Sequence, residues 1–232
     1  MFYKSADRMY RVQAWDEFDW LVYGFGTRHA TALPNELPHN LATVRQIHSA
    51  RVVDAAGGIG CLGEGDALMD NSAGTLLGIK TADCFPILLV DPKRRAVAAV
   101  HAGWRGTAQR IAAETVEAMV RRFGSTPDFL HAAMGPGIGK CCFEVGPEVA
   151  LELAGVDERR HIDLEAINRQ QLIDAGLSAK RIYSAGLCTV CNPRDFFSYR
   201  RDREHAGRML SVVGLKNNGR EKNPAPCEPA WL

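Results

Sequence analysis

Short apolar runs separated by turn residues recur along the chain and predict a series of buried strands. Runs of this length that are rich in β-branched and small apolar residues are typical of strands covered on both faces. The strands predicted in this way lie at 21–25, 44–47, 75–79, 85–90, 96–100, 130–134, 181–185 and 209–213. A Pro- and Asn-rich segment (29–40) and a Gly-rich segment (57–66) are predicted as loops between them.

The hydrophobic period changes to that of a helix after the strand at 96–100. Apolar and β-branched residues between 111 and 120 fall on one helical face, and Gly124 is placed to end that helix. Two further helices are predicted at 147–153 and 163–175, the second with Asp163 as N-cap and Gly176 as its stop. Together these elements predict one mixed α/β domain over 1–215. The Pro-rich stretch 216–232 has no periodicity and is predicted as a mobile tail.

Composition excludes several classes of protein. The 232 residues are 46% hydrophobic and 24% charged, as in an ordinary globular protein. Lys and Arg (28) nearly balance Asp and Glu (27), which argues against nucleic acid or an anionic membrane as the main partner. No apolar run approaches the roughly 18 residues of a membrane span. The absence of a signal-like N-terminus and the seven dispersed cysteines predict a cytoplasmic protein with reduced thiols.

Three side chains at strand ends are candidates for chemistry. His48, Cys84 and His101 each lie at or next to the end of a predicted strand, where α/β folds gather functional groups. Two imidazoles and a thiolate suit zinc, and three protein ligands leave a fourth position open for water or substrate. Cys84 could instead form a nucleophile–base pair with either histidine, with Asp83 orienting the base. The spacing alone leaves both interpretations open.

The segment HAGWRGT is a candidate anion site. Gly103 and Gly106 allow close approach of the backbone, Arg105 adds a fixed charge, and the following helix offers free N–H groups. The alternative is a plain strand–helix turn with a solvated arginine. GPGIG at 135–139 is not a full dinucleotide fingerprint and is more typical of a turn.

The remaining polar motifs favour structural roles. Cys188 and Cys191 have the CxxC spacing without a second such pair, and successive residues of an extended chain, such as Cys141 and Cys142, point opposite ways. At most one of the latter two should face a given site, and all four are predicted as buried structural thiols. The arginines of FFSYRRDREHAGR are predicted to form a solvated face, and Asp66 to be a turn residue.

Six blocks of sequence, taken together, resemble one known family. They are RQIHSARV, GDALMD, KTADCFPILLVDP, AAVHAGWRGT, MGPGIGKCCFEVGPEV and GLCTVCNPRDFFSYRRD, in this order. They resemble the YfiH-like family, long labelled a laccase domain or multicopper polyphenol oxidase and later described as purine nucleoside phosphorylases. The resemblance extends from about residue 25 to about residue 215.

The resemblance implies a fold, a metal and an activity. The fold would be a layered α/β/β/α sandwich similar to the catalytic domain of cytotoxic necrotizing factor toxins, a kinship that keeps a Cys/His hydrolase as an alternative. His48, Cys84 and His101 would bind catalytic zinc. The reaction would be phosphorolysis of adenosine, inosine, guanosine and methylthioadenosine, with adenosine deamination as a side activity. Purine nucleosides and phosphate are therefore the expected partners.

Within this activity, phosphate needs cationic ligands. Arg105 with the amides around Gly103 and Gly106 is the first candidate site, and Arg45 and Lys80 are further candidates.

The older copper assignment fits the histidine content poorly. A laccase needs a trinuclear copper cluster in addition to a Cys–His copper centre. The chain has seven histidines, and His29, His39, His131, His161 and His205 show no H-x-H pairing. A single His₂Cys site could bind copper adventitiously, since copper(II) binds such ligands more tightly than zinc.

Overall fold

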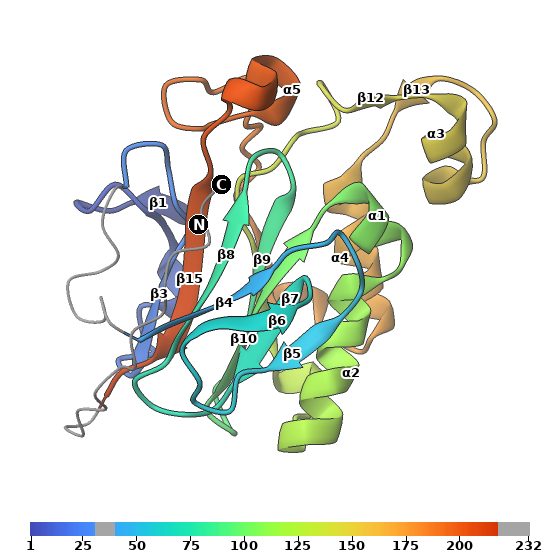
Figure 1. Ribbon diagram of the computed structural model, residues 1–232. Helices are drawn as coiled ribbons and strands as arrows, with labels where there is room; N and C mark the ends of the chain where they lie inside the picture. Colours follow the sequence, from blue (N-terminus) through green and yellow to red (C-terminus); the bar gives the residue numbers. More distant parts are fainter. Residues whose placement is uncertain (31–39, 218–232) are drawn as a thin grey trace.

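The computed structural model describes residues 1–30 and 40–217, and two mixed β-sheets form its centre (Figure 1). The six-stranded sheet has the order β14 (Ile182–Ser184), β11 (His131–Met134), β9 (Phe85–Asp91), β10 (Ala96–Ala102), β7 (Ala67–Asp70) and β5 (Val52–Asp54). The five-stranded sheet has the order β3 (Leu21–Gly24), β15 (Met209–Leu215), β8 (Leu76–Thr81), β4 (Leu41–Arg45) and β6 (Gly60–Glu64). Five neighbouring pairs in these two sheets are antiparallel. The other four are parallel: β4 with β8, β4 with β6, β5 with β7, and β11 with β14.

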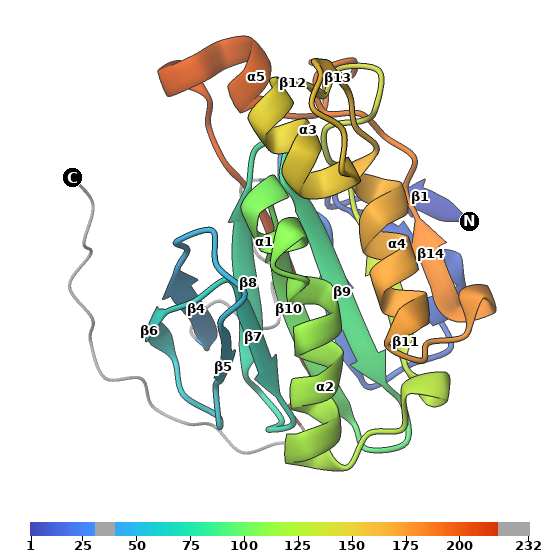
Figure 2. The same ribbon diagram turned by 90° about the vertical axis from the view of Figure 1, so that its right-hand side faces the viewer.

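The six-stranded sheet is buried on both faces, which explains its continuous apolar runs. Helices α2 (Ile111–Phe123) and α4 (Leu164–Asp174) cover one face, and the five-stranded sheet covers the other (Figures 1 and 2). On β9, Ile87 and Leu89 pack in the helix-side core, whereas Leu88 and Val90 pack between the two sheets. The alternation of side chains along one strand thus supplies both cores.

The described layers are α, β and β rather than the full four-layer sandwich implied by the resemblance. The smaller helices α1 (Trp104–Ala108) and α3 (Pro147–Ala154) lie on the same side as α2 and α4, and α5 (Tyr199–Asp202) lies beyond the β8–β9 turn (Figures 1 and 2). None of the helices α1–α5 therefore forms a fourth layer on the five-stranded sheet. Residues such as Met9 and Val22 form a small separate core on that sheet.

Short strands complete the fold. They form two small antiparallel sheets of two strands each, β1 (Phe2–Lys4) with β2 (Tyr10–Val12) and β12 (Glu144–Val145) with β13 (Arg160–His161). Single-turn 3₁₀ helices lie at Gln13–Trp15, Pro127–Phe129, Ala179–Arg181 and Arg203–His205. None of the helices in the described part of the chain is long and apolar enough to cross a membrane.

Several predicted boundaries are confirmed by the structure and several are wrong. The Asp163 carboxylate accepts a hydrogen bond from the Ala166 N–H as an N-cap, and Gly124 ends α2 in the left-handed region (φ 66°). The Gly-rich stretch is not a loop throughout, because residues 60–64 form β6. The segment after β10 is two helices rather than one, since Arg110 adopts a left-handed conformation (φ 63°) between α1 and α2. Residues 31–39 and most of the predicted tail lie outside the described residues.

Candidate metal centre

Two histidines and a cysteine from three different segments meet at one end of the six-stranded sheet. His101 is the second-to-last residue of β10, Cys84 immediately precedes β9, and His48 lies in the loop between β4 and β5. Figure 1 shows these three segments converging beside α1. The candidate ligand atoms of the three side chains all lie within 4.8 Å of one another. His101 is buried and Cys84 partly buried, while His48 is exposed, so the group opens to solvent at His48.

One buried carboxylate positions both histidines. Asp66 is fully buried, and its Oδ1 accepts hydrogen bonds from His101 Nδ1 and from the His48 N–H, each at 2.9 Å. Its Oδ2 accepts from the Ile47 N–H at 3.2 Å and from the Ser49 N–H and hydroxyl at 2.7 and 2.8 Å. These bonds hold the 47–49 loop in the left-handed turn at His48 (φ 60°). Because Nδ1 of His101 is hydrogen-bonded to Asp66, its Nε2 is the nitrogen that is free to bind a metal ion.

Asp66 is therefore not the ordinary turn residue that the sequence predicted. A carboxylate behind a ligand histidine is the usual partner that fixes ring orientation in metal sites. The only sequence signal for this role was that Asp66 belongs to GDALMD, one of the six blocks that carry the family resemblance. Its contact with His48 and His101 could not be predicted, because it depends on the pairing of strands that are far apart in the chain.

The thiol and the buried imidazole shift each other's pKa strongly. Burial raises the pKa of the Cys84 thiol, but hydrogen bonds with His101 and His48 outweigh this and lower the pKa to about 6. Burial lowers the pKa of His101, while its bonds to Asp66 and Cys84 raise it to about 9. For Asp66, burial raises the pKa, and the bonds from His101 and Ser49 together lower it to about 2. The sulfur is therefore poised to be a thiolate, the form that binds metals and attacks electrophiles.

The residues present fit a zinc ion with one open position. Two imidazoles and one thiolate form a known type of catalytic zinc ligand set, and the carboxylate behind His101 completes the usual surroundings. Gly103 faces the ligands directly, because a Cβ at this position would lie 2.9 Å from Cys84 Sγ and 3.2 Å from His48 Cδ2. The glycine thus leaves room for the cysteine and histidine to approach each other.

Gly103→Ala is expected to weaken metal binding more than folding. The added methyl group must displace Cys84 Sγ or the His48 ring, and overpacking of this kind costs about 1–3 kcal/mol. We expect the zinc affinity of the centre to fall by roughly tenfold or more, measured by competition with a chromophoric chelator. The far-ultraviolet circular dichroism spectrum should stay native. Unchanged zinc affinity would show that the glycine is not required for this approach.

Of the residues predicted to bind an anion, Arg105 is exposed to solvent, whereas Gly106 is packed against the His48 loop. Arg105 is exposed and lies over the Trp104 ring at 4.3 Å, with no carboxylate partner among the described residues. A Cβ on Gly106 would lie 3.1 Å from the Ser49 carbonyl oxygen and 3.3 Å from Ile111, so this glycine is needed for packing against the His48 loop. The structure therefore does not support the expectation that Gly106 opens an approach for an anion.

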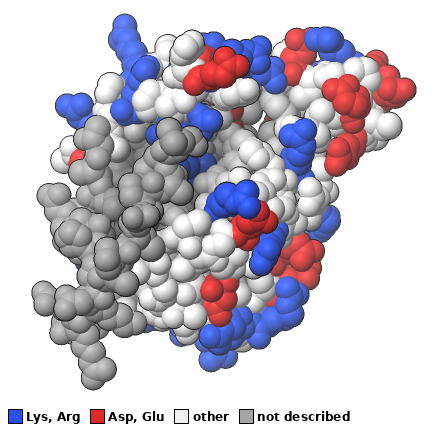
Figure 3. Space-filling view, in the orientation of Figure 1, with Lys and Arg blue, Asp and Glu red and all other residues white. Residues whose placement is uncertain are grey.

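The two further cation candidates are held differently. Arg45 forms an exposed ion pair with Glu64 on the neighbouring strand β6. Lys80 lies on β8 and exchanges two backbone hydrogen bonds, both 2.8 Å, with the Gln46 side chain. Across the face shown in Figure 3, basic and acidic side chains are interspersed.

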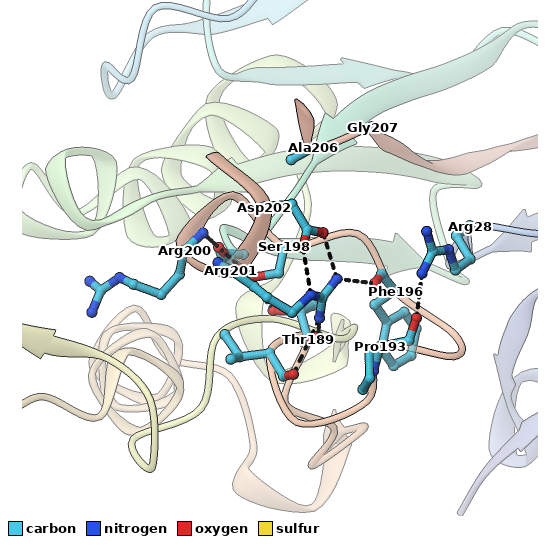
Figure 4. A network of polar contacts seen from close by, with 12 residues as sticks. Arg28, Thr189, Pro193, Phe196, Ser198, Arg200, Arg201, Asp202, Ala206 and Gly207 are labelled. Atoms are coloured by element: carbon cyan, nitrogen blue, oxygen red, sulfur yellow. Dashed lines mark hydrogen bonds and ion pairs between the residues drawn. The ribbon is translucent and has the colours of Figure 1, made fainter. Parts of the chain in front are cut away.

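Asp83 and Arg201 have structural roles, contrary to expectation, whereas Arg203 and Arg208 are exposed as predicted. Asp83 accepts hydrogen bonds from Thr189 Oγ1 at 2.6 Å, Ser198 Oγ at 3.1 Å and the Arg200 N–H at 2.6 Å, so it does not orient a histidine. Arg201 is not a solvated charge, because its guanidinium donates to the carbonyls of Thr189, Val190 and Phe196 and pairs with Asp202 (Figure 4).

The cysteine predictions also need correction. Cys141, Cys142, Cys188 and Cys191 form a second group whose sulfurs all lie within 4.8 Å of one another. They are not buried, since two are exposed and two are partly exposed. Cys141 and Cys142 both face the group because they lie in a turn closed by the Cys142 and Phe143 N–H groups on the Gly139 carbonyl. The alternation expected for an extended chain does not apply in a turn.

The fold and this centre define a mixed α/β domain with a solvent-open His₂Cys site. Residues 27–216 match the protein family described as multi-copper polyphenol oxidoreductase laccase. The chain belongs to this family, to which its blocks of sequence already pointed.

Relatives in this family carry names for two reactions. The chain is 44% identical over 186 residues to a protein of Deinococcus radiodurans named purine nucleoside phosphorylase, covering 76% of this chain and 70% of the relative. It is 41% identical over 199 residues to adenosine deaminase RL5 from an unknown prokaryotic organism, covering 76% of each. The solved structure of YlmD from Geobacillus stearothermophilus superposes with a TM-score of 0.85 at 28% identity, over 93% of this chain and 99% of that one.

The described residues offer few histidine ligands for the copper ions that the family's description names. Within residues 1–30 and 40–217, two groups of side chains are close enough to hold a metal, and His48 and His101 are their only histidines. A trinuclear copper cluster would need more histidines in one place.

Proposed function

We propose that this chain is a zinc-dependent purine nucleoside phosphorylase with adenosine deaminase activity. The observation that carries the proposal is the convergence of His48, Cys84 and His101 on one point with a position open to solvent. The names of the two relatives supply the reaction classes. When bound, zinc supplies a Lewis acid and lowers the pKa of water at its open position.

The two reactions place different demands on the residues around this centre. In phosphorolysis, a phosphate oxygen attacks C1′ of the ribose while the C1′–N9 bond breaks, giving the free purine and ribose 1-phosphate. In deamination, water adds at C6 of adenine and ammonia leaves, giving inosine. His48, Cys84 and His101 hold the metal for both, and Asp66 keeps the two histidines oriented. Phosphate needs cations that deamination does not.

We assign phosphate binding to Arg105, beside Gly103 at the start of α1, with Arg45 and Lys80 as outer cations. Arg105→Ala is expected to raise the KM for phosphate by about tenfold to a hundredfold, because an arginine–phosphate contact contributes roughly 1.5–3 kcal/mol. Deamination should change little. The measurement is steady-state kinetics of both reactions on adenosine. Arg121→Ala on α2 provides a control, since this exposed arginine forms a surface ion pair with Glu117 on its own helix. A parallel fall in both activities would place Arg105 outside the phosphate site.

A second candidate function is a cysteine hydrolase. Cys84, His101 and Asp66 are arranged as nucleophile, base and orienting carboxylate, and the Cys84 pKa is lowered to about 6. This enzyme would act without metal, and alkylation of Cys84 by iodoacetamide would inactivate it in the presence of a chelator.

The decisive experiment combines metal removal with product analysis. Purified protein is assayed on inosine with and without phosphate, before and after verified zinc removal and again after zinc is restored. The proposal expects ribose 1-phosphate as product, loss of activity on removal and recovery on addition. Full activity in the metal-free protein, or release of free ribose independent of phosphate, would favour the hydrolase.

A further inference from the structure

Four cysteines form a second group on the loops that follow two neighbouring strands. Cys141 and Cys142 lie in the turn after β11, and Cys188 and Cys191 lie in the turn after β14. Because β11 and β14 are parallel neighbours, both turns emerge at the same end of the sheet. All four thiols are free, and the Cys191 sulfur lies 3.6 Å from that of Cys141 and 3.4 Å from that of Cys142.

These separations match the ligand shell of one tetrahedral ion. Zinc–sulfur bonds of about 2.3 Å in a tetrahedron place the sulfurs about 3.8 Å apart. The four sulfurs here all lie within 4.8 Å of one another. A cluster of four irons would separate its cysteines more widely than a single ion does, so the compact group favours one ion.

The backbone around the group is organised by bonds that do not involve a metal. The Thr189 N–H donates to the Gly137 carbonyl at 3.0 Å, which extends the pairing of the two loops beyond the strands. The Gly139 N–H donates to Cys188 Sγ at 3.3 Å, an interaction that stabilises sulfur in its thiolate form. A Cβ on Gly139 would lie 3.2 Å from Cys188 Cβ and 3.3 Å from Cys141 Sγ, so the glycine leaves the thiols room to approach.

We propose that Cys141, Cys142, Cys188 and Cys191 bind one zinc ion as a closed structural site. Four thiolates in a tetrahedron are typical of structural zinc and leave no position for substrate, unlike the His₂Cys centre. The tetrathiolate carries net negative charge, and the Arg200 guanidinium lies beside it, donating to the Cys142 carbonyl at 3.2 Å and the Glu144 carbonyl at 2.9 Å.

The zinc would position the turn that carries Cys84. Thr189, between the two cysteines of the CxxC pair, donates its hydroxyl to Asp83 Oδ1 at 2.6 Å. The Ile138 N–H, from the other cysteine loop, donates to the Asp83 carbonyl at 2.7 Å. Asp83 has a positive φ of 86°, a conformation that needs such support, and it directly precedes Cys84. Fixing the two cysteine loops thus fixes the backbone next to the catalytic thiol.

Zinc counting in matched variants tests the site separately from the His₂Cys centre. The full chain and its variants are purified without chelator, loaded with zinc chloride, desalted and analysed for zinc by mass spectrometry. Cys191→Ser should lose about one zinc per chain relative to wild type, whereas Cys191→His should keep it, because histidine is also a zinc ligand. Cys61→Ser should be unchanged, since this exposed cysteine on β6 belongs to neither group.

A second experiment keeps all four cysteines of the group, so it still tests the site if Cys191→Ser does not fold. It uses cobalt(II) spectroscopy on the variant Cys84→Ala. Cys84→Ala removes the other thiolate site, so cobalt(II) bound to this variant should give the intense sulfur-to-metal charge transfer of four thiolates. Iodoacetamide labelling of Cys141 and Cys191, read by peptide mass spectrometry, should be slow with zinc and fast after chelation. Wild-type zinc content in a folded Cys191→Ser protein, or a disulfide within the cluster of zinc-loaded protein, would overturn the proposal. Loss of zinc from Cys84→Ala alone bears only on the His₂Cys centre.

Discussion

Cys84→Ala is expected to abolish both phosphorolysis and deamination, because one metal centre serves both reactions. The variant removes one of the three metal ligands and leaves only His48 and His101. Losing metal catalysis should slow both reactions by roughly a thousandfold, or about 4 kcal/mol in activation free energy. Rates are measured on adenosine with and without phosphate, together with zinc content. Cys61→Ala on β6 is the matched control and should keep full activity.

Chelation separates the two mechanisms that share Cys84. A metal-free cysteine hydrolase would also lose activity in Cys84→Ala, so this variant alone does not decide. Wild-type protein should lose both activities on zinc removal and regain them on zinc addition. If either reaction survives in Cys84→Ala with its zinc lost, that reaction does not use this centre.

Asp66→Asn is expected to weaken zinc binding at the His₂Cys centre by about tenfold to a hundredfold. Five donors converge on the two Asp66 oxygens, and an asparagine offers only one acceptor oxygen. Its amide group would face either His101 and the His48 N–H or the Ile47 and Ser49 donors, which leaves buried groups unsatisfied at about 1–3 kcal/mol each.

Asp70→Asn provides the matched control for this prediction. Asp70 lies at the other end of β7, is also buried, and accepts from the N–H groups of Gly57, Asn71 and Ser72. Both variants should lower the melting temperature, but only Asp66→Asn should lower the zinc affinity and the turnover number. Equal zinc affinity in the two variants would assign Asp66 a purely structural role.

The arginines illustrate how residue type alone leaves a role open. The sequence predicts an anion-binding role for Arg105 and a solvated position for Arg201. In the structure Arg105 is exposed, whereas Arg201 donates to three carbonyls and pairs with Asp202 (Figure 4). The difference arises from where the loop 189–196 lies relative to α5, which no local pattern specifies.

The sequence by itself determined the elements whose signals are local and the identity of the candidate ligands. The apolar runs of β9 and β10, the C-terminal end of α2 and the N-cap of α4 follow from side-chain period, glycine conformation and capping, which act within a few residues. Only the tertiary structure decided which polar groups meet. Asp66 reaches both histidines, and Cys141 and Cys142 join the CxxC pair, because strand pairing and turn geometry bring together segments far apart in the chain. A carboxylate or thiol has the same local sequence signal in a solvated turn as in a metal site, and its chemistry is set by the partners that the fold places around it.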